Sequence, residues 1–176
     1  MSPYRFRPFA RADLPMAARW LKSPEVARWW GDPEAELTLL SQDLDEPAMQ
    51  QWIVEHRAQP FAYVQTYRAG AWPQPHLQHL PADAQMIDAF IGEPAMLGRG
   101  HGRALLSAFA RRLIAAGAPA VAIDPNADNH RARRAYARAG FVGDRIVTTK
   151  EGPVVVMVFQ PGRASAAPPT PEHPLR

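Results

Sequence analysis

The 176-residue sequence contains no cysteine. This absence excludes a disulfide framework, a thiolate nucleophile and any zinc site built from cysteine ligands. No apolar run approaches the roughly 20 residues that a membrane-spanning helix requires. The first residues, Met-Ser-Pro-Tyr-Arg-Phe-Arg-Pro, lack the apolar stretch of a cleaved secretory signal. From these absences we expect a soluble, cytoplasmic protein without a membrane segment.

Lysine is nearly absent as well, since 18 of the 20 basic residues are arginine. The charges are unevenly spread along the chain. Residues 31–55 contain seven acids and no Lys or Arg, whereas residues 96–150 contain ten basic residues and three acids. Such a separation suits a protein that holds a cation on one side and an anion on the other. The alternative is that both segments are ordinary solvated surface.

The sequence does contain enough apolar material for a folded domain. Hydrophobic residues make up 47% of the chain and charged residues 21%, which is a globular composition. We predict a single domain at residues 1–160. The remaining residues 161–176 form a Pro/Ala-rich tail with too little apolar bulk to fold, and we predict that it is disordered.

Hydrophobic periodicity and turn signals predict alternating strands and helices. The predicted strands are residues 4–9, 49–55, 60–67, 86–91, 120–123, 141–149 and 153–159. The predicted helices are residues 14–23, with Asp13 as the N-cap, a short turn at 24–30, and residues 34–44, 103–116 and 129–139. Residues 68–85 are predicted to form a long loop of the kind that often serves as a functional lid. This order indicates an α/β protein with a mixed sheet and helices on both faces.

Three glycines, Gly98, Gly100 and Gly102, alternate where a predicted strand leads into a helix. Glycine lets the backbone approach an anion closely, and the first N–H groups of a helix lack intrahelical partners. With the helix dipole, these groups can cradle a phosphate. The spacing matches neither the dinucleotide-binding fingerprint nor the P-loop, so a merely tight strand-to-helix turn stays open as the alternative. His101 and the five scattered other histidines have no ligand spacing, and we predict no metal.

A second motif, N-x-x-A-x-x-x-Y-x-x-x-G-F, occupies residues 129–141 after the predicted strand 120–123. Together with the glycine turn, it resembles the GCN5-related N-acetyltransferase (GNAT) family. The family's turn begins with Arg or Gln, and Leu97 departs from that pattern here. The resemblance implies a GNAT fold, with a mixed, mostly antiparallel central sheet of six to seven strands and helices on both faces. It also implies that backbone amides of the turn bind the pyrophosphate of acetyl-CoA (coenzyme A).

Further short motifs narrow the resemblance. They are Trp29-Trp30, Gln51-Trp52, Ala62-Tyr63-Val64-Gln65-x-Tyr67, Met86-Ile87-Asp88, Ile123-Asp124-Pro125 and Thr148-Thr149-x-x-Gly152-Pro153. Over residues 4–159 the chain resembles the aminoglycoside 6′-N-acetyltransferases, and more distantly the acyltransferases that modify hydroxylysine or lysine in siderophore synthesis. The resemblance implies acetyl transfer from acetyl-CoA to the 6′-amino group of an aminoglycoside antibiotic, by direct attack of the amine on the thioester, and hence antibiotic resistance.

The resemblance also assigns roles to individual residues. Asp88 matches the general base, because an ammonium group must lose a proton before it attacks, and Tyr136 matches the proton donor to the leaving thiolate. The alternatives are that Asp88 is a polar residue satisfied at a strand edge and that Tyr136 belongs to the core. A backbone N–H near Ala89 or Phe90 is expected to polarise the acetyl carbonyl. The expected cofactor-binding residues are Ala89, Phe90, Ile91, Leu97, Gly98, Arg99, Gly100, His101, Gly102, Arg103, Asn129 and Arg133.

A polycationic amine substrate requires carboxylates and aromatic walls. The expected substrate-binding residues are Trp29, Trp30, Tyr67, Trp72, Asp83, Asp88, Asp124 and Glu151. The three tryptophans are equally compatible with an ordinary core position. We expect a small-molecule partner, no nucleic acid and no membrane, and both a monomer and a homodimer stay open.

Two rival functions also stay open. The first is acyl transfer to hydroxylysine or lysine in siderophore synthesis. The second is a non-catalytic GNAT module that binds acyl-CoA, against which the presence of both Asp88 and Tyr136 argues, since a pure binder needs neither.

Overall fold

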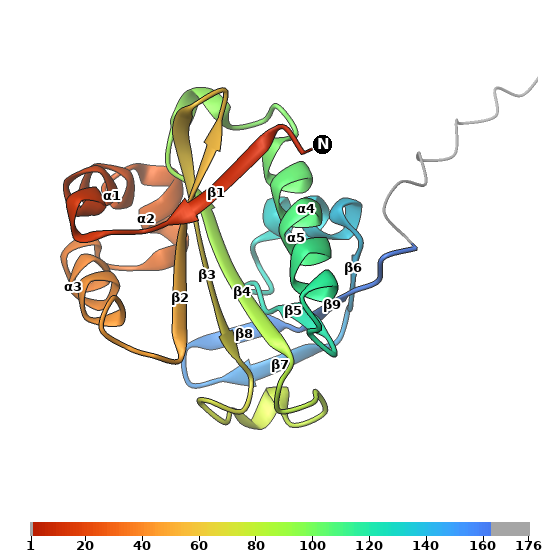
Figure 1. The fold of residues 1–176 in the computed structure, drawn as a ribbon. Coiled ribbons are helices and arrows are strands. Elements are labelled where there is room, and N and C mark those ends of the chain that lie inside the picture. Colours follow the sequence, from red (N-terminus) through yellow and green to blue (C-terminus); the bar gives the residue numbers. More distant parts are fainter. Residues whose placement is uncertain (1, 163–176) are drawn as a thin grey trace, which may run out of the picture.

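The computed structural model describes residues 2–162, so the predicted tail at 161–176 lies almost entirely outside the described residues. Seven strands form one sheet in the order β1-β2-β3-β4-β5-β9-β6 (Figure 1). They are β1 (Tyr4–Pro8), β2 (Met49–His56), β3 (Gln59–Arg68), β4 (Gln85–Ile91), β5 (Val121–Ile123), β9 (Met157–Phe159) and β6 (Phe141–Val142). Every neighbouring pair is antiparallel except β4–β5. The predicted fold class is therefore confirmed.

Five helices cover the two faces of this sheet. They are α1 (Leu14–Leu21), α2 (Pro24–Trp30), α3 (Pro33–Asp43), α4 (His101–Ala115) and α5 (His130–Ala139). Figure 1 shows α1–α3 on one side of the sheet and α4 and α5 on the other. No helix among residues 2–162 is long and apolar enough to cross a membrane.

Alternating side chains of the central strands supply a separate core to each face. Tyr63 of β3 and Phe90 of β4 pack with the helices α1–α3, whereas Val64 and Ile87 pack with Leu105 and its neighbours on α4. This alternation follows from the strand period of two residues. It also fixes which side chains of β4 reach which face, and this decides where Asp88 lies.

The start of α1 differs from the prediction in its chemistry. Asp13 does precede the helix, but its carboxylate makes no capping hydrogen bond there. It accepts instead from the backbone N–H of Ala10 at 2.9 Å and from the Arg7 guanidinium at 2.8 Å. A charge-assisted pair with arginine is the stronger interaction. By contrast, Asp32 caps α3 by accepting from the Ala35 N–H at 2.9 Å.

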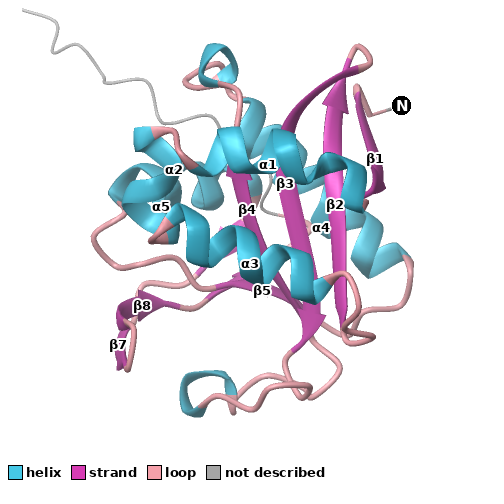
Figure 2. Ribbon diagram, turned by 90° about the vertical axis from the view of Figure 1, so that its left-hand side faces the viewer, coloured by secondary structure: helices cyan, strands magenta, loops and turns pink. Residues whose placement is uncertain are grey.

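The two predicted C-terminal strands are each broken in the structure. Their inner halves, β7 (Ile146–Thr149) and β8 (Gly152–Val155), form a separate two-stranded sheet. The break coincides with a close contact between the two strands, because Gly143 lies so near the other strand that a Cβ would sit 2.1 Å from the Val156 carbonyl oxygen. Figure 2 shows the β7–β8 hairpin projecting away from the main sheet. The turn of this hairpin carries Glu151.

The strands β4 and β5 separate soon after they meet. They pair only at Gln85 with Val121 and at Met86 with Ala122. Beyond these pairs, residues 87–91 of β4 have lost their neighbour on the β5 side. This gap between two parallel strands is called the splay below, and the glycine turn and α4 follow directly from its β4 side.

Candidate active site

The glycine turn presents open backbone at the start of α4. Gly98 and Gly100 have positive φ angles of 73° and 82°, and no protein atom lies within 4 Å of the Cβ position at either residue. The helix α4 begins at His101, two residues earlier than predicted. Its N-cap is Gly100, so no side chain makes a capping hydrogen bond there. The N–H groups of the first helical turn lack intrahelical acceptors and carry the positive end of the helix dipole. The turn is therefore suited to hold an anion.

The backbone of β4 offers a second binding edge. The Gly92 N–H donates to the Phe61 carbonyl on β3, and the Gln85 N–H donates to the Ala120 carbonyl on the β5 side. Because backbone groups alternate along an antiparallel strand, even-numbered residues of β4 bond to β3 and odd-numbered residues face the splay. The N–H groups of Ala89 and Ile91 thus point into the splay.

Phe90 is oriented differently from its neighbours Ala89 and Ile91. Its backbone pairs with Tyr63 on β3, and its ring packs against Trp30 at a centroid distance of 4.8 Å. Of the two residues expected to polarise a carbonyl, only Ala89 presents its N–H to the splay. Of the two alternatives, the geometry therefore favours Ala89, because the backbone N–H of Phe90 is directed toward β3.

Asp88 lies on β4 and is tied to the neighbouring strand. Gln65 of β3 donates from Nε2 to Asp88 Oδ2 at 3.0 Å, and Tyr63 in turn donates its hydroxyl to Gln65 Oε1 at 2.8 Å. Burial raises the pKa of Asp88 to about 7, with the negative charge of Asp124 as the next cause, while the Gln65 hydrogen bond acts in the opposite direction. A carboxylate with such a pKa accepts a proton effectively near neutral pH.

Three further carboxylates share the field of Asp88. Asp124 follows β5, Glu151 lies at the β7–β8 turn and Glu36 lies on α3, and each raises the pKa of Asp88. Burial also raises the pKa of Asp124 and of Glu36, and in both cases the charge of Glu151 adds to the effect. These four residues, from four separate elements, are called the acidic cluster below.

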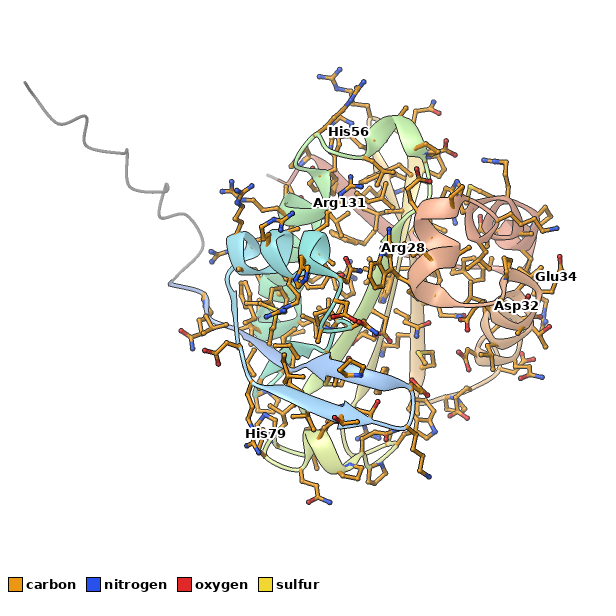
Figure 3. All side chains as sticks on the ribbon, turned by 180° about the vertical axis from the view of Figure 1, so that it is seen from behind. Arg28, Asp32, Glu34, His56, His79 and Arg131 are labelled. Carbon is orange, nitrogen blue, oxygen red and sulfur yellow. The ribbon has the colours of Figure 1, made fainter. Side chains whose placement is uncertain are left out.

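Glu36 was missed as a site residue by the sequence reasoning. The available signal was the acidic segment 31–55, which contains it together with six other acids. Nothing in that segment distinguishes Glu36 from Glu34, which lies on the surface paired with Lys22 and is labelled in Figure 3. Only the position of α3 against the sheet brings Glu36 toward Asp88.

Asp83, in contrast, does not join the acidic cluster. Its side chain is 74% exposed and forms an ion pair with Arg68 at 3.5 Å. It is absent from the groups that shift the pKa of Asp88 or Asp124. Asp83 therefore lies apart from the acidic cluster, beside Arg68 and solvent, and its role in substrate binding stays a prediction.

Tyr136 of α5 faces the same region. Burial raises its pKa, and the charges of Asp88 and Asp124 raise it further. The phenol therefore keeps its proton at neutral pH and remains a donor. Its ring also packs against the core that includes Phe141, so a core position and proximity to Asp88 are combined in one residue.

The predicted aromatic walls divide into two kinds. Trp30 packs edge-on against Phe90 and Tyr63, as a core residue does. Trp72 packs against Tyr67 at 5.3 Å, and the pKa of Tyr67 is raised by burial and then by the charges of Asp88, Asp124 and Glu151. The Tyr67–Trp72 pair therefore borders the acidic cluster, whereas Trp30 supports the sheet.

Trp29 is only partly buried, and it lies under the Arg28 guanidinium at 5.0 Å. Figure 3 labels Arg28 on α2 and Arg131 on α5, two helices that cover opposite faces of the sheet. Arg99 in the glycine turn and Arg103 in the first turn of α4 are both exposed.

Three further residues predicted to bind the cofactor, Asn129, Arg133 and His101, form hydrogen bonds within the protein. Asn129 caps α5, because its side-chain oxygen accepts from the Ala132 N–H at 3.1 Å. Arg133 donates to the Ala127 carbonyl at 2.8 Å. The His101 ring forms a hydrogen bond with the Tyr4 hydroxyl at 2.9 Å and lies 4.9 Å from the His56 ring. Within residues 2–162 no group of three or more potential ligands is placed to hold a metal ion.

Comparison with known proteins gives consistent matches. The model of the acetyltransferase (GNAT) domain family matches residues 10–149. The chain is 32% identical over 161 residues to aminoglycoside N(6′)-acetyltransferase type 1 of Klebsiella pneumoniae, which covers 83% of this chain and 77% of that protein. A structure of AAC(6′)-Ib in complex with paromomycin and acetyl-CoA has a TM-score of 0.80 at 27% identity, over 93% of this chain and 96% of that chain. Another, of AAC(6′)-Ib with coenzyme A and kanamycin, has a TM-score of 0.78 at 27% identity, over 88% and 93%.

Proposed function

The chain belongs to the GNAT acetyltransferase family, and we propose that it transfers the acetyl group of acetyl-CoA to the 6′-amino group of an aminoglycoside. The similarity to aminoglycoside N(6′)-acetyltransferase type 1 supports this substrate class. The observation that carries the proposal is Asp88, a carboxylate with a pKa raised to about 7 that stands on β4 within the acidic cluster. A polycationic amine is attracted by that cluster, and its reacting ammonium group requires such a base.

The residues at the splay fit acetyl-CoA. The free space over Gly98 and Gly100 lets a pyrophosphate reach the backbone N–H groups at the start of α4. Arg99 and Arg103 are exposed beside this turn and complement the phosphate charge. The open backbone edge at Ala89 and Ile91 suits the amide groups of a pantetheine arm, which can bond to it as a neighbouring strand would. When bound, acetyl-CoA supplies an acetyl group activated as a thioester.

Asp88 and Tyr136 divide the proton chemistry between them. Asp88 accepts a proton from the substrate ammonium, and the Gln65 hydrogen bond holds its Oδ2 while the other carboxylate oxygen, Oδ1, stays available. Tyr136 keeps its own proton at neutral pH, since burial and the nearby carboxylates raise its pKa. It is therefore the group with a proton to donate on the α5 side of the splay. The Ala89 N–H is the donor that stabilises a developing negative charge on the carbonyl oxygen.

The remaining ammonium groups of the substrate are bound by Glu36 and Glu151 of the acidic cluster. Glu36 and Glu151 come from α3 and from the β7–β8 turn, so they approach Asp88 from different directions. The Tyr67–Trp72 pair provides an aromatic wall beside them. Cations are favoured over aromatic faces and near carboxylates, and a multiply charged sugar satisfies both.

Thiol release from acetyl-CoA tests this function with a matched pair of acceptors. Neomycin and paromomycin differ at the 6′ position, where neomycin carries an amine and paromomycin a hydroxyl. We expect turnover with neomycin and kanamycin, and none with paromomycin. Equal turnover with neomycin and paromomycin would exclude the 6′ position. Turnover only with N6-hydroxylysine would instead identify an acyltransferase of the siderophore type.

A further inference from the structure

The loop between β3 and β4 is anchored to the body of the protein. Its two ends continue the strand pairing, with hydrogen bonds from the Ala69 N–H to the Ala84 carbonyl at 2.9 Å and from the Gly70 N–H to the Ala82 carbonyl at 2.8 Å. In its middle, Leu77 is 3% exposed and packs in a cluster with Met86 and Ala122. A loop held at three points presents its neighbouring side chains at fixed positions.

His76, next to Leu77, is the side chain that this loop delivers to the acidic cluster. Its Nε2 lies 2.9 Å from Asp124 Oδ2, and the two side chains are only 9% and 18% exposed. The imidazole is a hydrogen-bond donor that carries a positive charge when protonated. One oxygen of the Asp124 carboxylate is therefore already hydrogen-bonded to a side chain of the protein itself.

His79 provides an internal comparison in the same loop. It is exposed, and no contact with Asp124 is present. Both histidines line a cavity of about 490 Å³ between the loop and the β7–β8 hairpin. Figure 3 labels His79 near the loop, below the hairpin. The two residues thus share a loop and a cavity but differ in the contact with the acidic cluster.

We propose that His76 is a specificity-determining residue that masks Asp124, so that the acceptor site recognises amines through Asp88, Glu36 and Glu151 and gains little from Asp124. This inference rests on the proposed function, because it concerns how the acceptor amines are read. One physical argument supports it: a carboxylate oxygen already bonded to a buried imidazole offers a weaker site for an ammonium group, and a protonated imidazole repels that group.

The test compares two acceptors that share the reacting amine. Kanamycin carries several further ammonium groups, whereas methyl 6-amino-6-deoxyglucoside carries only the reacting one. We expect His76→Ala to lower the KM for kanamycin about ten-fold, the effect of one added charge-assisted hydrogen bond, with kcat little changed. The kcat/KM for the monoamine glycoside should stay constant. His76→Gln keeps an N–H donor near Asp124 and should retain the wild-type KM, and His79→Ala serves as the control for the loop.

A double-mutant cycle assigns the gain to Asp124. We expect Asp124→Asn to raise the kanamycin KM about ten-fold more in the His76→Ala background than in the wild type. If His76→Ala does not fold, His76→Asn serves as the unmasking variant, because its shorter side chain does not span the distance to Asp124. An equal effect of Asp124→Asn in both backgrounds would overturn the masking role, as would a higher kanamycin KM in both unmasking variants. In those cases kanamycin is still acetylated, whereas a wild-type enzyme that acetylates neither acceptor refutes the proposed function itself.

Discussion

Replacement of Asp88 by asparagine tests the base directly, because the amide is nearly isosteric but has almost no basicity. The side chain stays beside Gln65, whose Nε2 donates to Oδ2 at 3.0 Å, so the local geometry is preserved. General base catalysis contributes about 10²- to 10⁴-fold in rate. We therefore expect kcat with kanamycin to fall by at least about 100-fold. The affinity for acetyl-CoA should change little, because the glycine turn is untouched.

The pH dependence of the wild type provides a second readout of the same group. With a pKa of about 7, the basic form of Asp88 is scarce at acidic pH, and about 1% of molecules carry it two pH units below the pKa. We expect log(kcat/KM) to rise with a slope near one up to pH 7 and to level off above it. This limb should be absent from Asp88→Asn.

Thiol release from acetyl-CoA under saturating kanamycin measures kcat, and calorimetry measures acetyl-CoA affinity. Asp83→Asn is the matched control, since it removes an exposed carboxylate of the same type that pairs with Arg68. The control should keep wild-type kcat. A decrease of less than about ten-fold in Asp88→Asn, together with an unchanged acidic limb, refutes the assignment of Asp88 as the base.

Four further predictions follow from the same geometry. Asp88→Asn should stabilise the fold at pH 8 by as much as about 4 kcal/mol. The reason is that the pKa of Asp88 rises from 3.8 to about 7 on folding, so the wild-type protein loses stability as pH rises between these two values. Thermal unfolding measures this gain, which should vanish at pH values below both. Tyr136→Phe should lower kcat by only about ten-fold, since water can replace the phenol as proton donor, and a loss as large as that of Asp88→Asn contradicts this. Gly100→Ala and Gly117→Ala each place alanine at a positive φ, 82° at residue 100 and 98° at residue 117, and each should lower the free energy of unfolding by about 1 kcal/mol. Calorimetry should show weaker acetyl-CoA binding only for Gly100→Ala. Glu36→Gln should raise the kanamycin KM about five-fold and leave that of a monoamine acceptor unchanged, and equal effects on both acceptors count against a role in substrate binding.

Much of the secondary structure is predictable because its signals are local. The alternation of Tyr4 and Phe6 with arginines marks β1, and the polar turn between residues 55 and 60 marks the β2–β3 hairpin. Gly100 ends the turn before α4, and Gly140 ends α5 with φ at 106°. These signals act over a few residues, within one turn of helix or one strand pair.

Predictions failed where contacts outside a residue's own helix or strand change what that residue does. Asp13 has the sequence position of an N-cap, but Arg7 and Ala10 take its carboxylate. The predicted strand at 141–149 breaks where Gly143 packs directly on Val156, a contact across two segments.

By itself, the sequence determined the glycine turn, the strand that carries Asp88 and the order of strands and helices, since each depends on residues adjacent in the chain. The tertiary structure alone decided that Asp88, Asp124, Glu151 and Glu36 form one cluster and that His76 covers one of them. The physical reason is that pKa values and ion pairing depend on burial and on distances in space. Residues from four elements acquire these properties only when α3, the splayed strands and the β7–β8 hairpin come together.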